Sequence, residues 1–152
     1  CKPCSGAGVI AVDATVAINI PAGISSGEKI RLANRGELGP GGGGHGDLLI
    51  RVNVNAHENF KRSGCDISSN VSLNIAEAAL GCQKGVPTLQ GPKKVSFQPG
   101  TQPGDKLRLK GLGAPSLRKN KIGNHILHVQ IEIPRNLSSE QVKIFNDLKK
   151  TL

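Results

Sequence analysis

The chain has 152 residues and a formal net charge of +9, with 20 Lys and Arg against 11 Asp and Glu. Its 20 Gly and 9 Pro favour short strands joined by turns over long helices. No apolar run approaches the roughly 20 residues that a membrane span needs, and 4 Cys are too few for a disulfide scaffold. Length and composition therefore predict one or two folded domains that are mostly β.

The chain begins with a C-x-x-C motif formed by Cys1 and Cys4, followed by a Ser-Gly-Ala-Gly segment. Two thiolates at this spacing bind zinc when two further ligands complete the site; a redox pair or an incidental motif is the alternative. Cys65 and Cys82 are single thiols, which usually pack as small apolar residues. A disulfide between them or a role as additional metal ligands is the alternative.

An internal repeat with a spacing of 77 residues organises the rest of the chain. The segment from Ala22 to Leu32 matches the segment from Pro99 to Leu109, and Gly46 to Val54 matches Gly123 to Ile131 at the same spacing. Ile18 and Ile20 fall on Val95 and Phe97 without a gap. A common spacing across separate blocks predicts two tandem β-subdomains of similar build.

The sequence pattern predicts three strands in each unit. In the first unit, Val16, Ile18 and Ile20 alternate along one strand, which ends at a Pro-Ala-Gly turn. A second strand runs from Lys29 to Leu32 with Ile30 and Leu32 facing inward, and a Gly-rich loop follows over residues 36–46. The third strand places four side chains on one face: Leu48, Ile50, Val52 and Val54. Leu49 and Arg51 therefore lie on the opposite face.

Two short helices complete the predicted elements. A strand over residues 67–73 leads to a helix over residues 75–80, with Asn74 and Glu77 as a capping box. Near the end of the chain, Ser138 begins a second helix with one apolar stripe: Val142, Phe145 and Leu148. The stripe predicts either packing on the last β-unit or contact with another chain.

At this point the motifs resemble those of a known family. The chain is similar to the C-terminal part of DnaJ-type (type I) co-chaperones, from the fourth zinc repeat onward. The segment from Cys1 to Gly8 resembles that repeat, and further matches follow in family order: Ile20 to Ile24, Gly46 to Leu48, His57 to Arg62, Ala78 to Gly81, Val86 to Gly91, Pro99 to Gly104, Lys110 to Gly113 and Ile133 to Ser138.

The resemblance implies a mostly β fold with two tandem β-sandwich-like subdomains, short helices and a C-terminal helix. It implies the end of a zinc-finger region over residues 1–12, client-binding domain I over 13–90, client-binding domain II over 91–137, and a helix over 138–152 that leads to a dimerisation segment. Cys1 and Cys4 would then be half of a zinc site whose other ligands are absent from this chain. The helix stripe would contribute to a homodimer in the full-length protein.

The resemblance also implies a function. Relatives bind unfolded polypeptides by adding a client strand to a sheet edge beside a shallow apolar groove, and deliver them to a DnaK-type ATPase chaperone. The resemblance also implies that the edge strand comes from sequence before the zinc repeats, which this chain lacks. By this reasoning the client contacts are Leu49, Arg51, Cys82 and Lys84. Lys84 would reduce the apolar area of the groove. Exposed Leu49 is either a client contact or is covered by a neighbouring loop.

Two other functional classes compete with a non-catalytic client-binding module. The charge of +9 suits a nucleic-acid binder, but such proteins stack bases on aromatic rings, and this chain has 3 Phe and neither Trp nor Tyr. A thiol oxidoreductase would use Cys1 and Cys4. We expect neither a specific nucleic-acid partner nor a membrane partner, and a location in the cytoplasm or in an organelle of bacterial descent.

Overall fold

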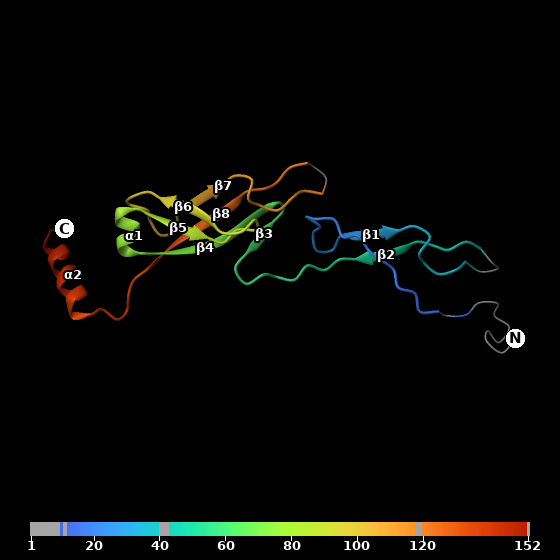
Figure 1. Cartoon of the computed structure of the whole chain (residues 1–152), viewed down its shortest axis with the longest axis horizontal. Helices are drawn as coiled ribbons and strands as arrows, with labels where there is room; N and C mark the ends of the chain where they lie inside the picture. The colour runs from blue at the N-terminus through green and yellow to red at the C-terminus, as the bar shows by residue number, and fades with distance from the viewer. Residues whose placement is uncertain (1–9, 11, 40–42, 118–119, 152) are drawn as a thin grey trace.

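The computed structural model describes residues 10, 12–39, 43–117 and 120–151. It is mostly β, with several sheets, no closed barrel and a C-terminal helix, in agreement with the predicted fold class of β-sandwich-like subdomains. Figure 1 shows an elongated arrangement with the first strands at one end, most of the strands in the middle and the C-terminal helix at the other end.

The first β-unit is a two-stranded antiparallel sheet. It consists of β1 (Lys29–Leu32) and β2 (Leu48–Arg51), in which Ile30 lies opposite Ile50. The Gly-rich loop between the strands is closed by a bridge between Leu38 and His45. Ile30, Leu32, Leu48 and Ile50 share the inward face as predicted, but they are only half-buried.

The second β-unit has two layers. A four-stranded sheet has the order β3 (Lys61–Ser63), β4 (Asp66–Asn74), β8 (His125–Glu132) and β7 (Lys106–Leu109). The hairpin of β5 (Cys82–Val86) and β6 (Lys93–Phe97) covers one face of it. β4 and β8 run parallel over eight residue pairs, from Ile67 opposite His125 to Asn74 opposite Glu132.

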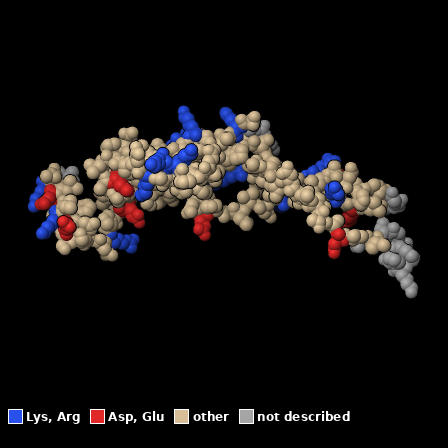
Figure 2. All heavy atoms as spheres, viewed as in Figure 1, with Lys and Arg blue, Asp and Glu red and all other residues tan. Residues whose placement is uncertain are grey.

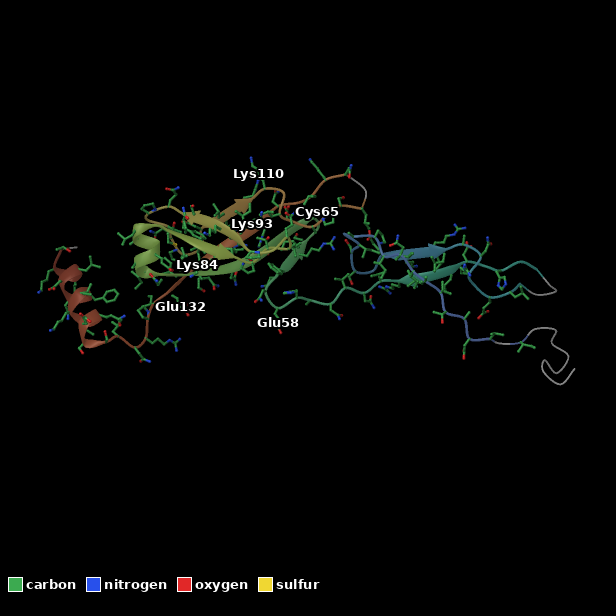
Figure 3. The ribbon with its side chains drawn as sticks, in the orientation of Figure 1. Glu58, Cys65, Lys84, Lys93, Lys110 and Glu132 are labelled. Carbon is green, nitrogen blue, oxygen red and sulfur yellow. The ribbon has the colours of Figure 1, made fainter. Side chains whose placement is uncertain are left out.

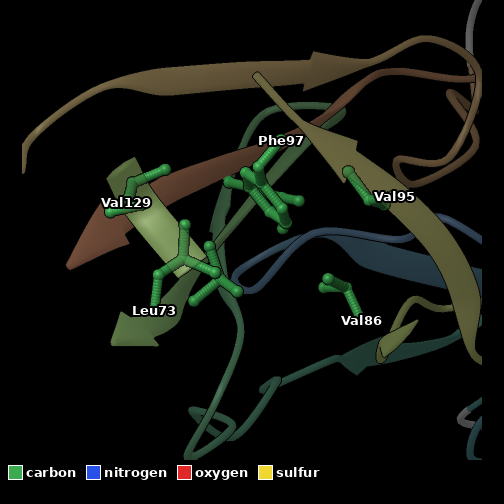
Figure 4. Packing of buried hydrophobic residues seen from close by; sticks show 8 residues of the cluster. Leu73, Val86, Val95, Phe97 and Val129 are labelled. Carbon is green, nitrogen blue, oxygen red and sulfur yellow. The ribbon is translucent and has the colours of Figure 1, made fainter. Parts of the chain in front are cut away.

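The buried core lies between these two layers of the second unit (Figure 4). It is formed by apolar side chains from β4, the helix α1 (Ile75–Leu80), β5, β6 and β8: Val71, Leu73, Ala78, Val86, Val95, Phe97, Leu127 and Val129. Leu73 and Leu127 are 0% exposed. β5 precedes residues 90 and 91 and β6 follows them, and both strands contribute side chains to this core. The predicted boundary between domains I and II therefore falls within one core and does not separate two.

The two helices begin at the predicted capping boxes. α1 (Ile75–Leu80) starts after Asn74, whose side chain accepts a hydrogen bond from the Glu77 amide at 2.7 Å, while the Glu77 carboxylate accepts from the Asn74 amide at 2.9 Å. α2 (Ser139–Thr151) starts after Ser138, which exchanges equivalent bonds with Gln141. Both predicted helix starts are therefore confirmed.

The strand pairing confirms the repeat, because equivalent residues lie opposite one another in both units. The pairs Lys29–Arg51 and Leu32–Leu48 in the first unit become Lys106–His128 and Leu109–His125 in the second, each shifted by the same 77 residues. Even the isolated bridge between Leu38 and His45 recurs between Pro115 and Ile122. Sequence duplication has therefore preserved the β1–β2 ladder as the β7–β8 ladder.

The predicted strand over residues 16–20 is wrong. The structure gives this segment no strand, and Ile18 and Ile20 are 41% and 58% exposed. Its counterpart in the second unit is β6, which is held by β5 through five residue pairs. In the described part of the chain nothing equivalent to β5 pairs with residues 16–20, so an alternating pattern alone does not make a strand there.

Candidate functional site

The outer edge of β2 is the strongest candidate for a binding site. β1–β2 is a two-stranded sheet, so among the described residues no strand pairs with the second edge of β2. In the second unit the equivalent strand is β8, and its equivalent edge is occupied by β4. The edge that β4 occupies in the second unit is thus unpaired among the described residues of the first unit.

The backbone of Leu49 and Arg51 faces this open edge. The Val52 amide donates to the Glu28 carbonyl at 2.9 Å, and the Val52 carbonyl accepts from the Gly27 amide at 2.8 Å, so Val52 faces β1. Successive residues of an antiparallel strand alternate between the two edges. Ile50 therefore also faces β1, and the amides and carbonyls of Leu49 and Arg51 point outward to the open edge.

The side chains of these two residues lie on the outer face of the sheet. Leu49 is 61% exposed, so the alternative in which a neighbouring loop covers it is wrong. Arg51 is exposed as well. Opposite Leu49, Arg31 is held by an ion pair with Asp47 at 2.6 Å. The edge thus offers backbone hydrogen bonds beside one apolar side chain and one cation.

Cys82 and Lys84 lie on a different sheet, and their side chains contact other residues of the second unit. Cys82 is half-buried and packs against the core, as expected for a small apolar residue. The Lys84 ammonium donates to the Ser72 carbonyl at 2.6 Å and lies 3.6 Å from the Glu77 carboxylate. Figure 3 places Lys84 near α1 and β4, away from β1–β2, so the structure does not bring the four predicted client contacts together.

The stripe on α2 is not buried by the β-unit. Val142 and Leu148 are 41% and 47% exposed, and no described residue of α2 is buried. Phe145 lines an open hollow of about 1050 Å³ with Ile131, Ile133 and Leu137. Close packing of the stripe on the last β-unit is therefore not observed, and contact with another chain stays a prediction.

The predicted zinc ligands, Cys1 and Cys4, lie outside the described residues. Cys65 and Cys82 are free thiols, and the described residues contain no group of three or more His, Cys, Asp or Glu that could hold a metal ion. None of the helices in the described part of the chain is both long enough and apolar enough to cross a membrane.

Lysine and arginine side chains are spread along the visible face rather than gathered on one patch (Figure 2). The densest pairs lie far apart in the fold, with Lys93 and Lys94 on β6 and Lys149 and Lys150 on α2. Phe97 is buried in the core, so its ring offers no face for base stacking. The described surface gives no positive support to the nucleic-acid alternative.

One polar cluster was missed by the sequence analysis. His125 is 0% exposed, its Nε2 lies 2.8 Å from the Ser69 Oγ, and its Nδ1 is buried without a partner in the structure. Phe60 packs edge-on against the ring. The repeat contained the signal, because His125 falls on the inward-facing Leu48. Since Ser69 is buried too, this Ser–His pair is a core hydrogen bond that no substrate reaches.

Burial lowers the pKa of His125 below its usual value of 6.5. Below about pH 6.5 the unfolded chain therefore protonates the His125 imidazole more readily than the folded chain does, and the free energy of unfolding falls as the pH drops through that range. We expect urea midpoints to decline from pH 7 to pH 5, and His125→Leu to flatten this decline. His45→Gln, at an exposed histidine, should leave it unchanged; an unaltered decline in His125→Leu would contradict this assignment.

Comparison with known proteins agrees with this architecture. The family model for the DnaJ C terminal domain matches residues 9–134. The chain is 40% identical over 147 residues to the Chaperone protein DnaJ of Syntrophobacter fumaroxidans, covering 97% of this chain and 38% of that protein. Identity to the proteins of the same name is 39% over 151 residues in Erysipelothrix rhusiopathiae and 42% over 151 residues in Brucella canis, covering 99% of this chain and 41% and 40% of those proteins.

The chain thus spans about two fifths of the length of these curated relatives. The match includes both β-units and the repeat that relates them. The chain belongs to the DnaJ C-terminal domain family.

Proposed function

We propose that this chain is the client-binding part of a co-chaperone, and that it binds extended segments of unfolded polypeptides as an added strand on the open edge of β2. The observation that carries the proposal is the edge of β2 at Leu49 and Arg51, with which no described strand pairs, whereas the equivalent edge of β8 in the second unit pairs with β4. Membership in the DnaJ C-terminal domain family supports the chaperone role.

The duplicate also indicates the direction of the client. β4 lies parallel to β8, and β8 is the counterpart of β2. A client that uses the same hydrogen-bonding positions would therefore run parallel to β2. Backbone hydrogen bonds are common to every polypeptide, so this mode suits many different clients, while Leu49 favours apolar side chains. Cys82 and Lys84 remain additional predicted contacts on the other unit.

The test is a peptide whose two backbone edges are distinguished chemically. We expect a fluorescent eight-residue apolar peptide to bind. Two variants carry N-methyl groups on the odd-numbered or on the even-numbered residues, and only one of the two should bind more weakly, because only one backbone edge of the peptide faces β2. Loss of two hydrogen bonds at about 1 kcal/mol each corresponds to roughly 30-fold weaker binding. Fluorescence anisotropy gives the affinities.

The two methylated peptides have the same composition, so each is the control for the other. Equal binding by both registers would show that the peptide is held through its side chains alone. An equal loss of affinity in both would show that the peptide does not hydrogen-bond through one backbone edge alone. Either result would contradict strand addition at β2.

For the complete protein we propose three further roles. Cys1 and Cys4 provide two of four zinc ligands, since thiolates at this spacing are a donor pair that zinc prefers. The exposed stripe on α2, formed by Val142, Phe145 and Leu148, contributes to a homodimer. Bound clients pass to a DnaK-type ATPase chaperone. Similarity to proteins named Chaperone protein DnaJ supports these proposals.

A further inference from the structure

The guanidinium of Arg62 connects the two β-units. Arg62 is the middle residue of β3, in the second unit, and its guanidinium reaches the turn that precedes β1. Its two terminal nitrogens donate to the carbonyls of Ile24 at 2.7 Å and Gly23 at 2.6 Å, while Nε donates to the carbonyl of Gly64 at 2.8 Å. The planar guanidinium holds these donors in a fixed geometry, so Arg62 ties both units to one another.

The same turn makes a second, steric contact with the second unit. Gly23 has a φ of 92°, and a Cβ at this position would collide with the carbonyl oxygen of Pro115 and lie 2.9 Å from its carbonyl carbon. Gly100 is the counterpart of Gly23 in the repeat and has a similar φ of 80°, yet a Cβ there would meet nothing within 4 Å. The close approach at Gly23 is therefore a property of the joint and not of the turn.

The connection between the units has no regular structure of its own. Residues 52–60, between β2 and β3, form neither strand nor helix. A linker of this kind leaves the orientation of the units to the contacts between them. Figure 1 shows the turn before β1 on the side of the first unit that faces β3. The hydrogen bonds of Arg62 and the close approach of Gly23 to Pro115 both lie at this turn.

We propose that Arg62 and Gly23 form a joint that holds the two β-units in one fixed orientation. Arg62 acts as the clamp through its hydrogen bonds to the turn before β1, and Gly23 allows this turn to pack closely against Pro115. The joint fixes the distance between the open edge of β2 and the second unit. A segment of one polypeptide that touches both units would then meet them at a constant spacing, which raises its effective concentration at the second contact.

Residual dipolar couplings measured on the isotopically labelled chain test this proposal directly. In the unaltered chain, amides of β1–β2 and of β4–β8 should fit one common alignment tensor. Arg62→Ala should separate them into two tensors, with alignment of the first unit reduced about twofold by motion relative to the second. Arg62→Lys, which keeps the charge but loses the fork, should resemble Arg62→Ala.

The repeat supplies matched controls. Gly23→Ala and Gly100→Ala place alanine at similar positive φ values in equivalent turns, but only Gly23→Ala should change the orientation of the first unit. Arg108→Ala removes an exposed arginine of β7 and should leave one tensor. Two tensors in the unaltered chain, or one tensor in both Arg62→Ala and Gly23→Ala, would overturn the joint. Neither result depends on whether β2 binds clients.

Discussion

Leu73→Ala should lower the free energy of unfolding by about 2–5 kcal/mol, the range for a fully buried leucine that leaves a cavity. Leu73 is 0% exposed and lies in the buried cluster between the two layers of the second unit. Its neighbours come from strands held in a parallel ladder and a hairpin, so they cannot collapse easily into the space. Urea unfolding followed by far-UV circular dichroism measures the loss.

Leu32→Ala is the matched control in the first unit. Leu32 faces inward but is only half-buried, and the first buried residue among those described is Ile67. An isolated two-stranded sheet is marginally stable in water. We therefore expect Leu32→Ala to shift the main unfolding transition by less than about 0.5 kcal/mol. Equal losses in the two variants would show that both units share one cooperative core, contrary to the packing described above.

Much of the local structure could be predicted because it depends on residues close in sequence. The capping boxes of Asn74 and Ser138 need only a partner three residues away, and both form. The repeat also predicts equivalent strands, because the same turn chemistry and alternation recur at a constant spacing. The inward position of Ile30 and the outward position of Leu49 follow from alternation alone.

The remaining features depend on which segments meet. Nothing in the pattern of β4 indicates that it pairs in parallel with β8, from Ile67 opposite His125 onward. For the same reason the alternation over residues 16–20 predicts a strand, although no described segment pairs with these residues. Burial of His125 depends on the same tertiary contacts, although its alignment with Leu48 was visible in the repeat.

The candidate site divides along the same line. Alternation placed Leu49 and Arg51 outward, but the open edge that gives them a role is a property of sheet topology. Lys84 shows the converse, because its interaction with the Ser72 carbonyl joins residues on neighbouring elements and has no signature in sequence. Arg62 likewise reaches a turn nearly forty positions earlier, so only the folded arrangement reveals the clamp.

Residue-resolved amide hydrogen exchange, with and without the apolar peptide, tests the central claim most directly. Ile50 already faces β1, whereas the amides of Leu49 and Arg51 face the open edge. Peptide binding should slow exchange at Leu49 and Arg51 by about tenfold or more, with little change at Ile50. Protection confined to β5, or unchanged exchange at Leu49 and Arg51 under saturating peptide, would contradict strand addition at the edge of β2.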